Sequence, residues 1–210
     1  MRKNLVYGIL VFCLISICSP TVLLAEESDR PDWLIPFTRE TSIFGEPEVT
    51  RQQMVDYIMA RNPSPSLSCS LEELVDLYYE EAGVEGIRPD LALCQAIKET
   101  GYFAYGGDVV PEQNNYCGLG TTGGGVKGAY FATPREGVRA QIQHLLAYSS
   151  PRLPFYPIVD PRYELLKEYR RDIFGKVLTW EGLSGRWAVP GINYGRQIVN
   201  ILEDVKKKTA

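Results

Sequence analysis

One glutamate stands where a proton-donating group would be useful. In the stretch LALCQAIKETGYF, residues 91–103, Glu99 ends an apolar helical run and is followed by Thr100 and then by a glycine and two aromatic residues. At 100° per residue it shares a helix face with Ala92, Gln95 and Ala96, so the surface around it is small and polar. Partial desolvation and the negative end of the helix dipole both raise a carboxyl pKa. We therefore predict that Glu99 is a general acid at the floor of a groove.

Two motifs in a fixed order surround this glutamate. The first is QAIKETGYF, residues 95–103, and the second is NNYCGLG, residues 114–120. Together they resemble the glucosaminidase domains of bacterial peptidoglycan hydrolases, the endo-β-N-acetylglucosaminidases of the glycoside hydrolase family 73 type. The resemblance runs from about Ser70 to the C-terminus. Lytic transglycosylases follow their own glutamate with a G-L-M-Q segment, so NNYCGLG favours the glucosaminidase family.

The resemblance implies a fold, a reaction and a substrate. It implies a lysozyme-like helical domain that cuts the β-1,4 bond next to N-acetylglucosamine in peptidoglycan glycan strands. Glu99 would give its proton to the leaving oxygen, and neither a metal nor another cofactor is expected. Tyr194 matches a late tyrosine of the family, and its hydroxyl would orient the 2-acetamido group or stabilise the oxocarbenium-like transition state.

A second catalytic group is not evident from the sequence. Glycosidases commonly use two carboxyl groups, but the stretch where the family carries a hairpin glutamate, residues 120–131, holds no acid. Asp108, Glu112 and Glu136 are the nearest acids; Glu136 is better explained as the capping partner of Thr133, which leaves Asp108 as the best of the three. The substrate's own acetamido oxygen is the other route, which we favour slightly.

Further residues are expected to contact the sugar. Gln95 and Asn115 carry amides that suit sugar hydroxyl or N-acetyl groups, and aromatic rings suit the faces of pyranose rings. We predict that four aromatic residues line the substrate groove: Tyr102, Tyr116, Tyr130 and Trp187. His144, flanked by Ile142 and Leu145, is expected to be structural.

The N-terminus predicts export. Residues 1–25 carry Arg2 and Lys3 and then an apolar run that ends at Ala25, as in a cleaved signal peptide. An uncleaved membrane anchor is the alternative, because the run is nearly long enough to span a bilayer. We expect the mature protein in the periplasm, the cell wall or the extracellular space.

Composition excludes several classes of protein. The chain has a net charge of −4, which becomes −6 when Arg2 and Lys3 leave with the signal, so a nucleic-acid footprint is absent. One histidine and no clustered cysteines make a zinc site improbable. Three cysteines follow the signal, so at most one bridge forms, and whether Cys94 pairs with Cys117 stays open. We expect a monomer.

Local signals divide the mature chain in two. Residues 26–66 form a leader with one short helix over 51–61, and its first part, up to about Gly45, is expected to pack loosely. Residues 67–210 form the catalytic domain. Capping patterns and apolar periodicity predict helices over 71–83, 89–101, 134–148 and 194–207, with shorter ones beginning near 161 and 179. Glycine-rich residues 114–131 predict a small β-hairpin. The fold class is therefore mainly α (α+β), a lysozyme-like domain with a hairpin after the helix that carries Glu99.

A second function remains compatible with these residues. A module that binds peptidoglycan but is catalytically weak or inactive would keep the groove, and the missing hairpin acid is the observation that favours it.

Overall fold

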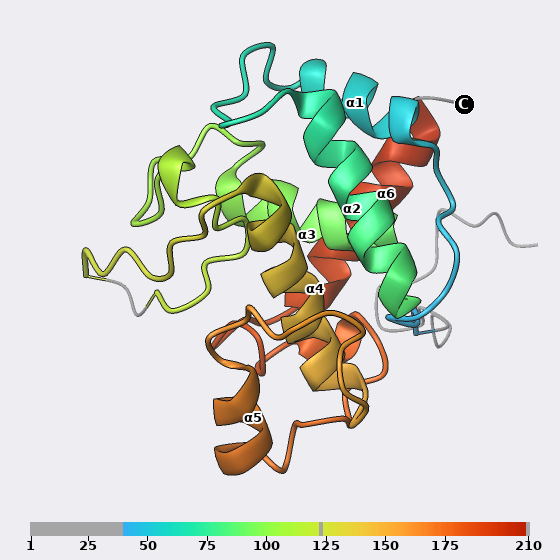
Figure 1. Cartoon of the computed structure of the whole chain (residues 1–210). Helices are drawn as coiled ribbons and strands as arrows, with labels where there is room; N and C mark the ends of the chain where they lie inside the picture. The colour runs from blue at the N-terminus through green and yellow to red at the C-terminus, as the bar shows by residue number, and fades with distance from the viewer. Residues whose placement is uncertain (1–39, 122–123, 209–210) are drawn as a thin grey trace, which may run out of the picture. The chain divides into compact units, whose positions relative to one another are not determined.

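A computed structural model describes residues 40–121 and 124–208. The predicted signal peptide, and the first part of the predicted leader, lie outside the described residues. The elements run, in chain order, α1 Arg51–Met59, α2 Leu71–Glu85, α3 Pro89–Thr100, the 3₁₀ turn η3 Pro111–Gln113, α4 Pro134–Ser149, α5 Tyr163–Tyr169, the 3₁₀ turn η4 Glu181–Leu183 and α6 Tyr194–Lys208 (Figure 1). The mainly helical fold class is confirmed.

Most helices begin at the predicted caps. The Thr50 hydroxyl accepts from the backbone N–H of Gln53, whose side chain accepts from the backbone N–H of Thr50 in return. Ser70 and Thr133 cap α2 and α4 in the same position. The predicted end of α2 at Gly83 is wrong, because Gly86, not Gly83, adopts the left-handed conformation that stops the helix.

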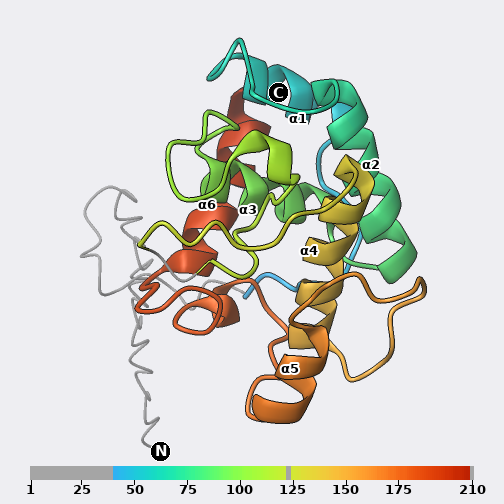
Figure 2. The same ribbon diagram turned by 60° about the vertical axis from the view of Figure 1, so that its left-hand side comes forward.

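The helix that carries Glu99 is also the most deeply buried one. Every residue from Leu91 to Ile97 is buried, and α3 contacts α2 on one side and α6 on the other, while α2 also packs against α4. Both ribbon views show α3 enclosed among these helices (Figure 2). Only its last turn, with Lys98 and Glu99, reaches the surface. The core therefore holds Glu99 from behind and leaves its front free.

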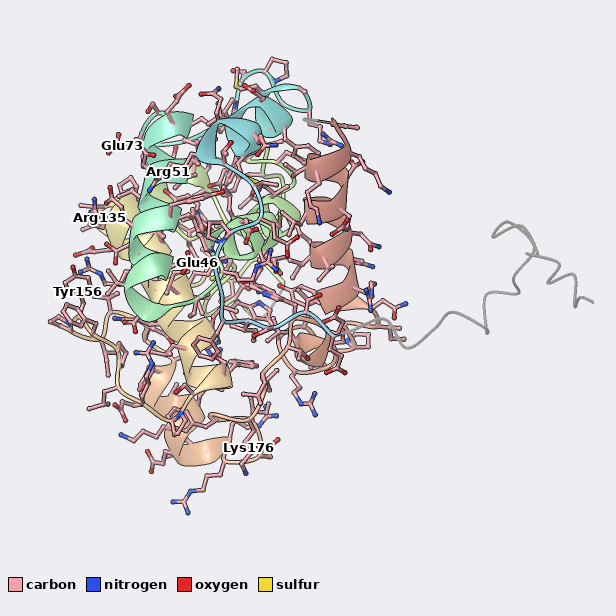
Figure 3. All side chains as sticks on the ribbon, turned by 90° about the vertical axis from the view of Figure 1, so that its right-hand side faces the viewer. Glu46, Arg51, Glu73, Arg135, Tyr156 and Lys176 are labelled. Atoms are coloured by element: carbon pink, nitrogen blue, oxygen red, sulfur yellow. The ribbon has the colours of Figure 1, made fainter. Side chains whose placement is uncertain are left out.

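The described part of the predicted leader belongs to the same compact unit as the helices that follow it. Ile43 is fully buried, and its N–H donates to the carbonyl of Leu178 at 3.0 Å. The N–H of Gly45 donates to the carbonyl of Gly86. Figure 3 shows Glu46 on this segment, and Arg51 beside α2, where it pairs with Asp76 at 3.1 Å. Residues 40–66 are therefore packed into the domain and not loosely attached to it.

The predicted β-hairpin is not confirmed. Within the described residues the backbone forms isolated bridges and no strand, and the segment after η3 is a series of turns. Side-chain amides take the place of a ladder: Gln113 Nε2 donates to the carbonyl of Lys127 at 2.5 Å, and Asn115 Nδ2 donates to those of Leu119 at 2.9 Å and Ala129 at 3.2 Å. The loop is therefore held from inside by amides, which the glycine pattern does not reveal.

Two glycines bring backbone against backbone at the first turns of helices. A Cβ at Gly137 of α4 would lie 1.8 Å from the carbonyl oxygen of Asn114, and one at Gly195 of α6 would lie 1.8 Å from that of Trp180. No other residue fits at either position without displacing the neighbouring segment. The loop after α3 and the segment after α5 are thus fixed directly to α4 and α6.

Two further predictions can be compared with the described residues. Cys69, Cys94 and Cys117 are all free thiols. Among the residues of the two described ranges, none of the helices is both long and apolar enough to cross a membrane.

Candidate active site

Glu99 lies at the junction of two adjoining cavities. Both are lined by Glu99, Gly118 and Thr121, so the two cavities form one groove with the carboxyl group between them. The side chain is solvent-exposed toward this groove. A sugar chain laid along the groove would therefore pass directly over Glu99.

The smaller cavity, here called the aspartate lobe, has a volume of about 240 Å³ and is lined by parts of residues 99–109 together with Asn115, Gly118 and Thr121. Asp108 supplies a second carboxylate there, and its Oδ1 accepts from the backbone N–H of Gly125 at 3.0 Å. Tyr105 also lines this lobe, but its hydroxyl is buried and has no hydrogen-bond partner among the described residues. Burial raises the pKa of Tyr105 to about 12, so this hydroxyl is neutral.

The larger cavity, here called the arginine lobe, has a volume of about 550 Å³. Its walls come from residues 117–121, from α4, from α5 and its flanks, and from residues 186–189. The aromatic wall is Trp187, whose ring centroid lies 4.8 Å from that of His144 and 5.4 Å from that of Tyr148. Three arginines also line this lobe: Arg162, Arg170 and Arg186.

Behind Glu99 lies a buried chain of hydrogen bonds. The hydroxyl of Tyr194 donates to Glu99 Oε1 in a very short contact and accepts from Gln95 Nε2 at 2.9 Å. Gln95 Oε1 accepts from Gln141 Nε2 at 2.9 Å. Gln141 Oε1 accepts from the hydroxyl of Tyr78 at 2.6 Å. Helices α2, α3, α4 and α6 each contribute to this chain, so the core is tied to the carboxyl group of Glu99.

One backbone atom sets the direction of that chain. Gln141 Nε2 also donates to the carbonyl of Ala92 at 2.9 Å, and a carbonyl can only accept. The amide nitrogen of Gln141 must therefore face Gln95, which turns the oxygen of Gln95 toward it and the nitrogen of Gln95 toward Tyr194. The single proton of Tyr194 is then left for Glu99. A protonated Glu99 must consequently carry its proton on Oε2, the oxygen with no hydrogen bond among the described residues.

The surroundings of Glu99 favour its neutral form. Removal of water by the protein around the carboxyl group raises its pKa, while the hydrogen bond from Tyr194 and the charge of Lys98 lower it in part. Because Glu99 is open to the groove, water screens part of this effect. Burial and the nearby Glu99 raise the pKa of Tyr194 well above its usual value, so its hydroxyl remains a donor.

The backbone after Glu99 is unusual. Gly101, Tyr102, Phe103 and Tyr105 all have φ between 57° and 59°, which is costly for residues other than glycine. The hydroxyl of Thr100 holds this turn, since it donates to the carbonyl of Ala96 at 2.7 Å and accepts from the N–H of Phe103 at 3.0 Å. Phe103 is fully buried and anchors the turn. The strained turn carries Tyr105 into the aspartate lobe.

The structure brings some of the predicted residues together and separates others. Asp108 and Asn115 line the aspartate lobe and Trp187 lines the arginine lobe. Tyr194 touches Glu99 from the core side. The others lie away from the groove.

Gln95 and Tyr116 are buried in the core, with 0% and 1% exposure, and neither lines a lobe. Tyr102 packs on Tyr57 of α1, with ring centroids 6.2 Å apart. Tyr130 is 60% exposed and lines neither lobe. The side-chain amide of Asn115 already donates to the carbonyls of Leu119 and Ala129 within the loop, which leaves it little capacity to bind a sugar.

The other acids are accounted for. The Thr133 hydroxyl accepts from the backbone N–H of Glu136 at 3.2 Å, as predicted, but the side chain of Glu136 accepts from the N–H of Ala132 at 2.9 Å and not from that of Thr133. Glu112 is exposed and lines neither lobe. His144 does have a structural partner, because its Nδ1 lies 2.8 Å from Oδ2 of the fully buried Asp160, yet it also faces the arginine lobe.

Sequence reasoning missed the arginines and Gln141. Arg162 and Arg170 lie in segments that carry no motif. Arg186 precedes Trp187 in the stretch GRWAVPGINYG, residues 185–195, which shares the family resemblance, but it was not singled out. Gln141 is 46 positions from Gln95. Gln141 is a polar residue within the apolar stripe of residues 137–148, and this is the only sign of it that the sequence offers.

Comparison with known proteins agrees with the motifs. The family model described as "Glucosaminidase: Mannosyl-glycoprotein endo-beta-N-acetylglucosaminidase" matches residues 75–207, which include Glu99, both lobes and Tyr194. The chain belongs to the glucosaminidase family.

One protein similar to this glucosaminidase is an uncharacterized protein of Borreliella burgdorferi. The two are 32% identical over 151 residues, which cover 72% of this chain and 70% of the relative. No solved structure matches the chain significantly. The glucosaminidase family is a family of glycosidases, which act on glycans. In the described ranges, no group of three or more His, Cys, Asp or Glu side chains is placed to hold a metal ion.

Proposed function

We propose that this glucosaminidase is an exported endo-β-N-acetylglucosaminidase that cleaves the β-1,4 bond after N-acetylglucosamine in peptidoglycan, with Glu99 as general acid. The observation that carries the proposal is a single carboxyl group with a raised pKa in the middle of a groove, with one oxygen bonded to Tyr194 and the other free. A protonated carboxyl group so placed can protonate the oxygen of a glycosidic bond.

The first step moves one proton and breaks one bond. Glu99 Oε2 gives its proton to the glycosidic oxygen as the bond from that oxygen to the anomeric carbon breaks. The hydroxyl of Tyr194 stays on Oε1 and stabilises the carboxylate that forms. The leaving sugar departs with a new 4-hydroxyl group.

Two routes remain for the electron-deficient anomeric carbon. In the route that we favour, the 2-acetamido oxygen attacks it, and Glu99 then removes a proton from the water that opens the resulting ring. In the other route, Asp108 acts in the aspartate lobe. Asp108→Asn distinguishes them: a loss of less than about threefold in kcat, with inhibition by a thiazoline analogue, supports the acetamido route. A collapse of kcat would assign the second role to Asp108.

The decisive experiment compares the wild-type protein with Glu99→Gln on purified peptidoglycan. The wild type should release new reducing ends that mass spectrometry identifies as N-acetylglucosamine, and the variant should be slower by at least about 10³-fold. Equal release by both proteins would contradict the role of Glu99. Binding without release by either would instead favour a wall-binding module, the function that the missing second acid supports.

Export is the part of the proposal that rests on residues 1–25. The mass of the protein recovered from the cell envelope or medium tests it, since cleavage after Ala25 gives a chain that begins at Glu26. Recovery of the full-length chain from the membrane would favour the anchor.

A further inference from the structure

We propose that the arginine lobe binds the carboxylate of an acidic sugar substituent, with Arg162 as the residue that selects it. The inference rests on the proposed function, because it decides which sugar of the glycan strand lies on each side of Glu99. The carboxylate has two possible sources on a muramyl sugar, its lactyl group or its attached peptide. The two lobes differ in charge, and this difference carries the argument.

The charge contrast comes from the lining residues. Arg162, Arg170 and Arg186 face the arginine lobe, where Glu99 at the junction is the one acid among the lining residues. The aspartate lobe has Asp108 and Glu99 and no basic lining residue. An anionic sugar is therefore attracted to the first lobe and repelled from the second.

Arg162 has the freest charge of the three arginines. Arg170 forms two bonds of 3.1 Å with Asp172, and Arg186 Nη1 donates to the carbonyl of Gly182 at 2.8 Å. The guanidinium of Arg162 makes no hydrogen bond or ion pair with the described residues. A planar guanidinium in this state suits a carboxylate, which it can bind through two parallel hydrogen bonds.

The backbone of Arg162 is held in place from within. Its N–H donates to Oδ1 of Asp160 at 2.8 Å, and Asp160 is a fully buried carboxylate whose other oxygen contacts His144. The imidazole of His144 in turn packs on Trp187, the aromatic wall of the same lobe. A sugar ring on Trp187 and a carboxylate on Arg162 would thus be positioned by one connected cluster.

The test compares three forms of one substrate. Peptide-bearing strands, peptide-free strands with a free lactyl carboxylate, and peptide-free strands whose carboxylate is converted to a neutral methylamide are assayed with wild type, Arg162→Gln and Arg171→Gln. Arg171 is an exposed arginine of the same segment that lines neither lobe, and it is the matched control.

Arg162→Gln should lower kcat/KM about tenfold on the carboxylate that it binds and leave the methylamide unchanged. A loss on peptide-free strands assigns the lactyl group, and a loss on peptide-bearing strands alone assigns the peptide. Equal losses on all three substrates, or losses equal to those of Arg171→Gln, would overturn the proposal. Calorimetric binding to the Glu99→Gln protein repeats the comparison without turnover, so a failure of the hydrolase assignment is seen separately.

A second inference follows from the hydrogen-bond chain and does not depend on the lobes. We infer that Gln141 is a positioning residue that, through Gln95, keeps the proton of Tyr194 directed at Glu99. Without Gln141, Gln95 is free to rotate its amide and to present its oxygen to Tyr194. Tyr194 would then donate to Gln95, and Glu99 would lose its hydrogen bond.

Tyr78 supplies the control for this inference. Its hydroxyl donates to Gln141 Oε1, but the carbonyl of Ala92 already fixes the direction of Gln141. Tyr78→Phe and Gln141→Leu each remove buried hydrogen bonds, so both should lower stability, and only Gln141→Leu should alter the titration of Glu99. The charged or titratable groups facing Glu99 that both variants retain are Tyr194, Lys98, Tyr105, Asp108, Cys117 and the His144, Arg162, Arg170 and Arg186 side chains.

The measurement is the pH profile of kcat/KM together with a carbon-13 NMR titration of the Glu99 carboxyl, assigned by its absence in Glu99→Gln. Gln141→Leu should move the titration and the basic limb to higher pH, because loss of a hydrogen bond to the carboxylate favours the protonated form. Tyr78→Phe should leave both in place. A shift in both variants, or in neither, would overturn the inference, and the NMR titration gives a result even if the protein hydrolyses nothing.

Discussion

The two sides of Glu99 differ in how their polar groups are satisfied. On the core side, every side-chain amide and hydroxyl in the hydrogen-bond chain that joins Tyr78 to Glu99 has a partner. Only one direction of donation is possible along this chain. On the groove side, Glu99 Oε2 and the Arg162 guanidinium have none among the described residues. Polar groups left without partners on a rigidly paired support are what a polar ligand requires, because the ligand supplies the missing bonds.

After that of Glu99→Gln, the largest effect should come from the tyrosine that joins the two sides. Tyr194→Phe removes the donor to Glu99 Oε1, so kcat should fall about 10²-fold and the basic limb of the pH profile should move up. Steady-state kinetics across pH measures both. Tyr163→Phe is the matched control, because Tyr163 is a buried tyrosine whose hydroxyl donates to the carbonyl of Arg152 and lines neither lobe. If the two variants behaved alike, the link between the two sides would be refuted.

A smaller effect tests the groove side. Tyr105→Phe removes a buried hydroxyl that has no partner in the described protein, so stability should be unchanged or slightly higher. The hydroxyl is closed to solvent, so kcat/KM should fall about three- to tenfold only if a bound sugar displaces the turn that carries Tyr105 and reaches this group. Thermal unfolding and kinetics on the same preparation check both. A clear loss of stability would mean that the hydroxyl already has a partner in the free protein.

The smallest effect concerns the stability cost of Glu99 itself. A carboxyl whose pKa is raised on folding stabilises the fold in full below its unfolded pKa, and that contribution is lost as pH rises through the folded pKa. Glu99→Gln has no such loss. The Tm of the variant relative to the wild type should therefore rise as the pH is raised above the ordinary carboxyl pKa of 4.5, by a small amount because Glu99 is exposed. A constant difference would show that Glu99 is not perturbed.

Local signals predicted much of the fold. The caps at Thr50, Ser70 and Thr133 and the left-handed Gly101 depend on neighbours a few positions away, and the sequence displays them. The hairpin prediction is not confirmed because the carbonyls of the loop are satisfied by amides of residues 113–115, a pairing that no local pattern encodes.

The candidate site was predictable only where a motif carried it. Glu99 and Tyr194 lie 95 positions apart, and the family resemblance assigned both to the site, whereas their direct hydrogen bond is visible only in the structure. The burial of Gln95 and Tyr116 and the position of Tyr102 against α1 depend on tertiary packing. The arginine lobe is assembled from four separate segments, and the segments of α4 and α5 that line it carry no motif.

The contacts of Gly137 and Gly195 have a consequence for adapting this groove to other glycans. At these glycines the backbone of a neighbouring segment touches the backbone of a helix with no side chain in between. The distance between segment and helix therefore does not depend on any side-chain rotamer. Single substitutions can change which groups face a bound sugar, but they have little means of moving the walls apart. A broader or branched polymer would have to be accommodated by inserting or deleting residues in the connecting loops.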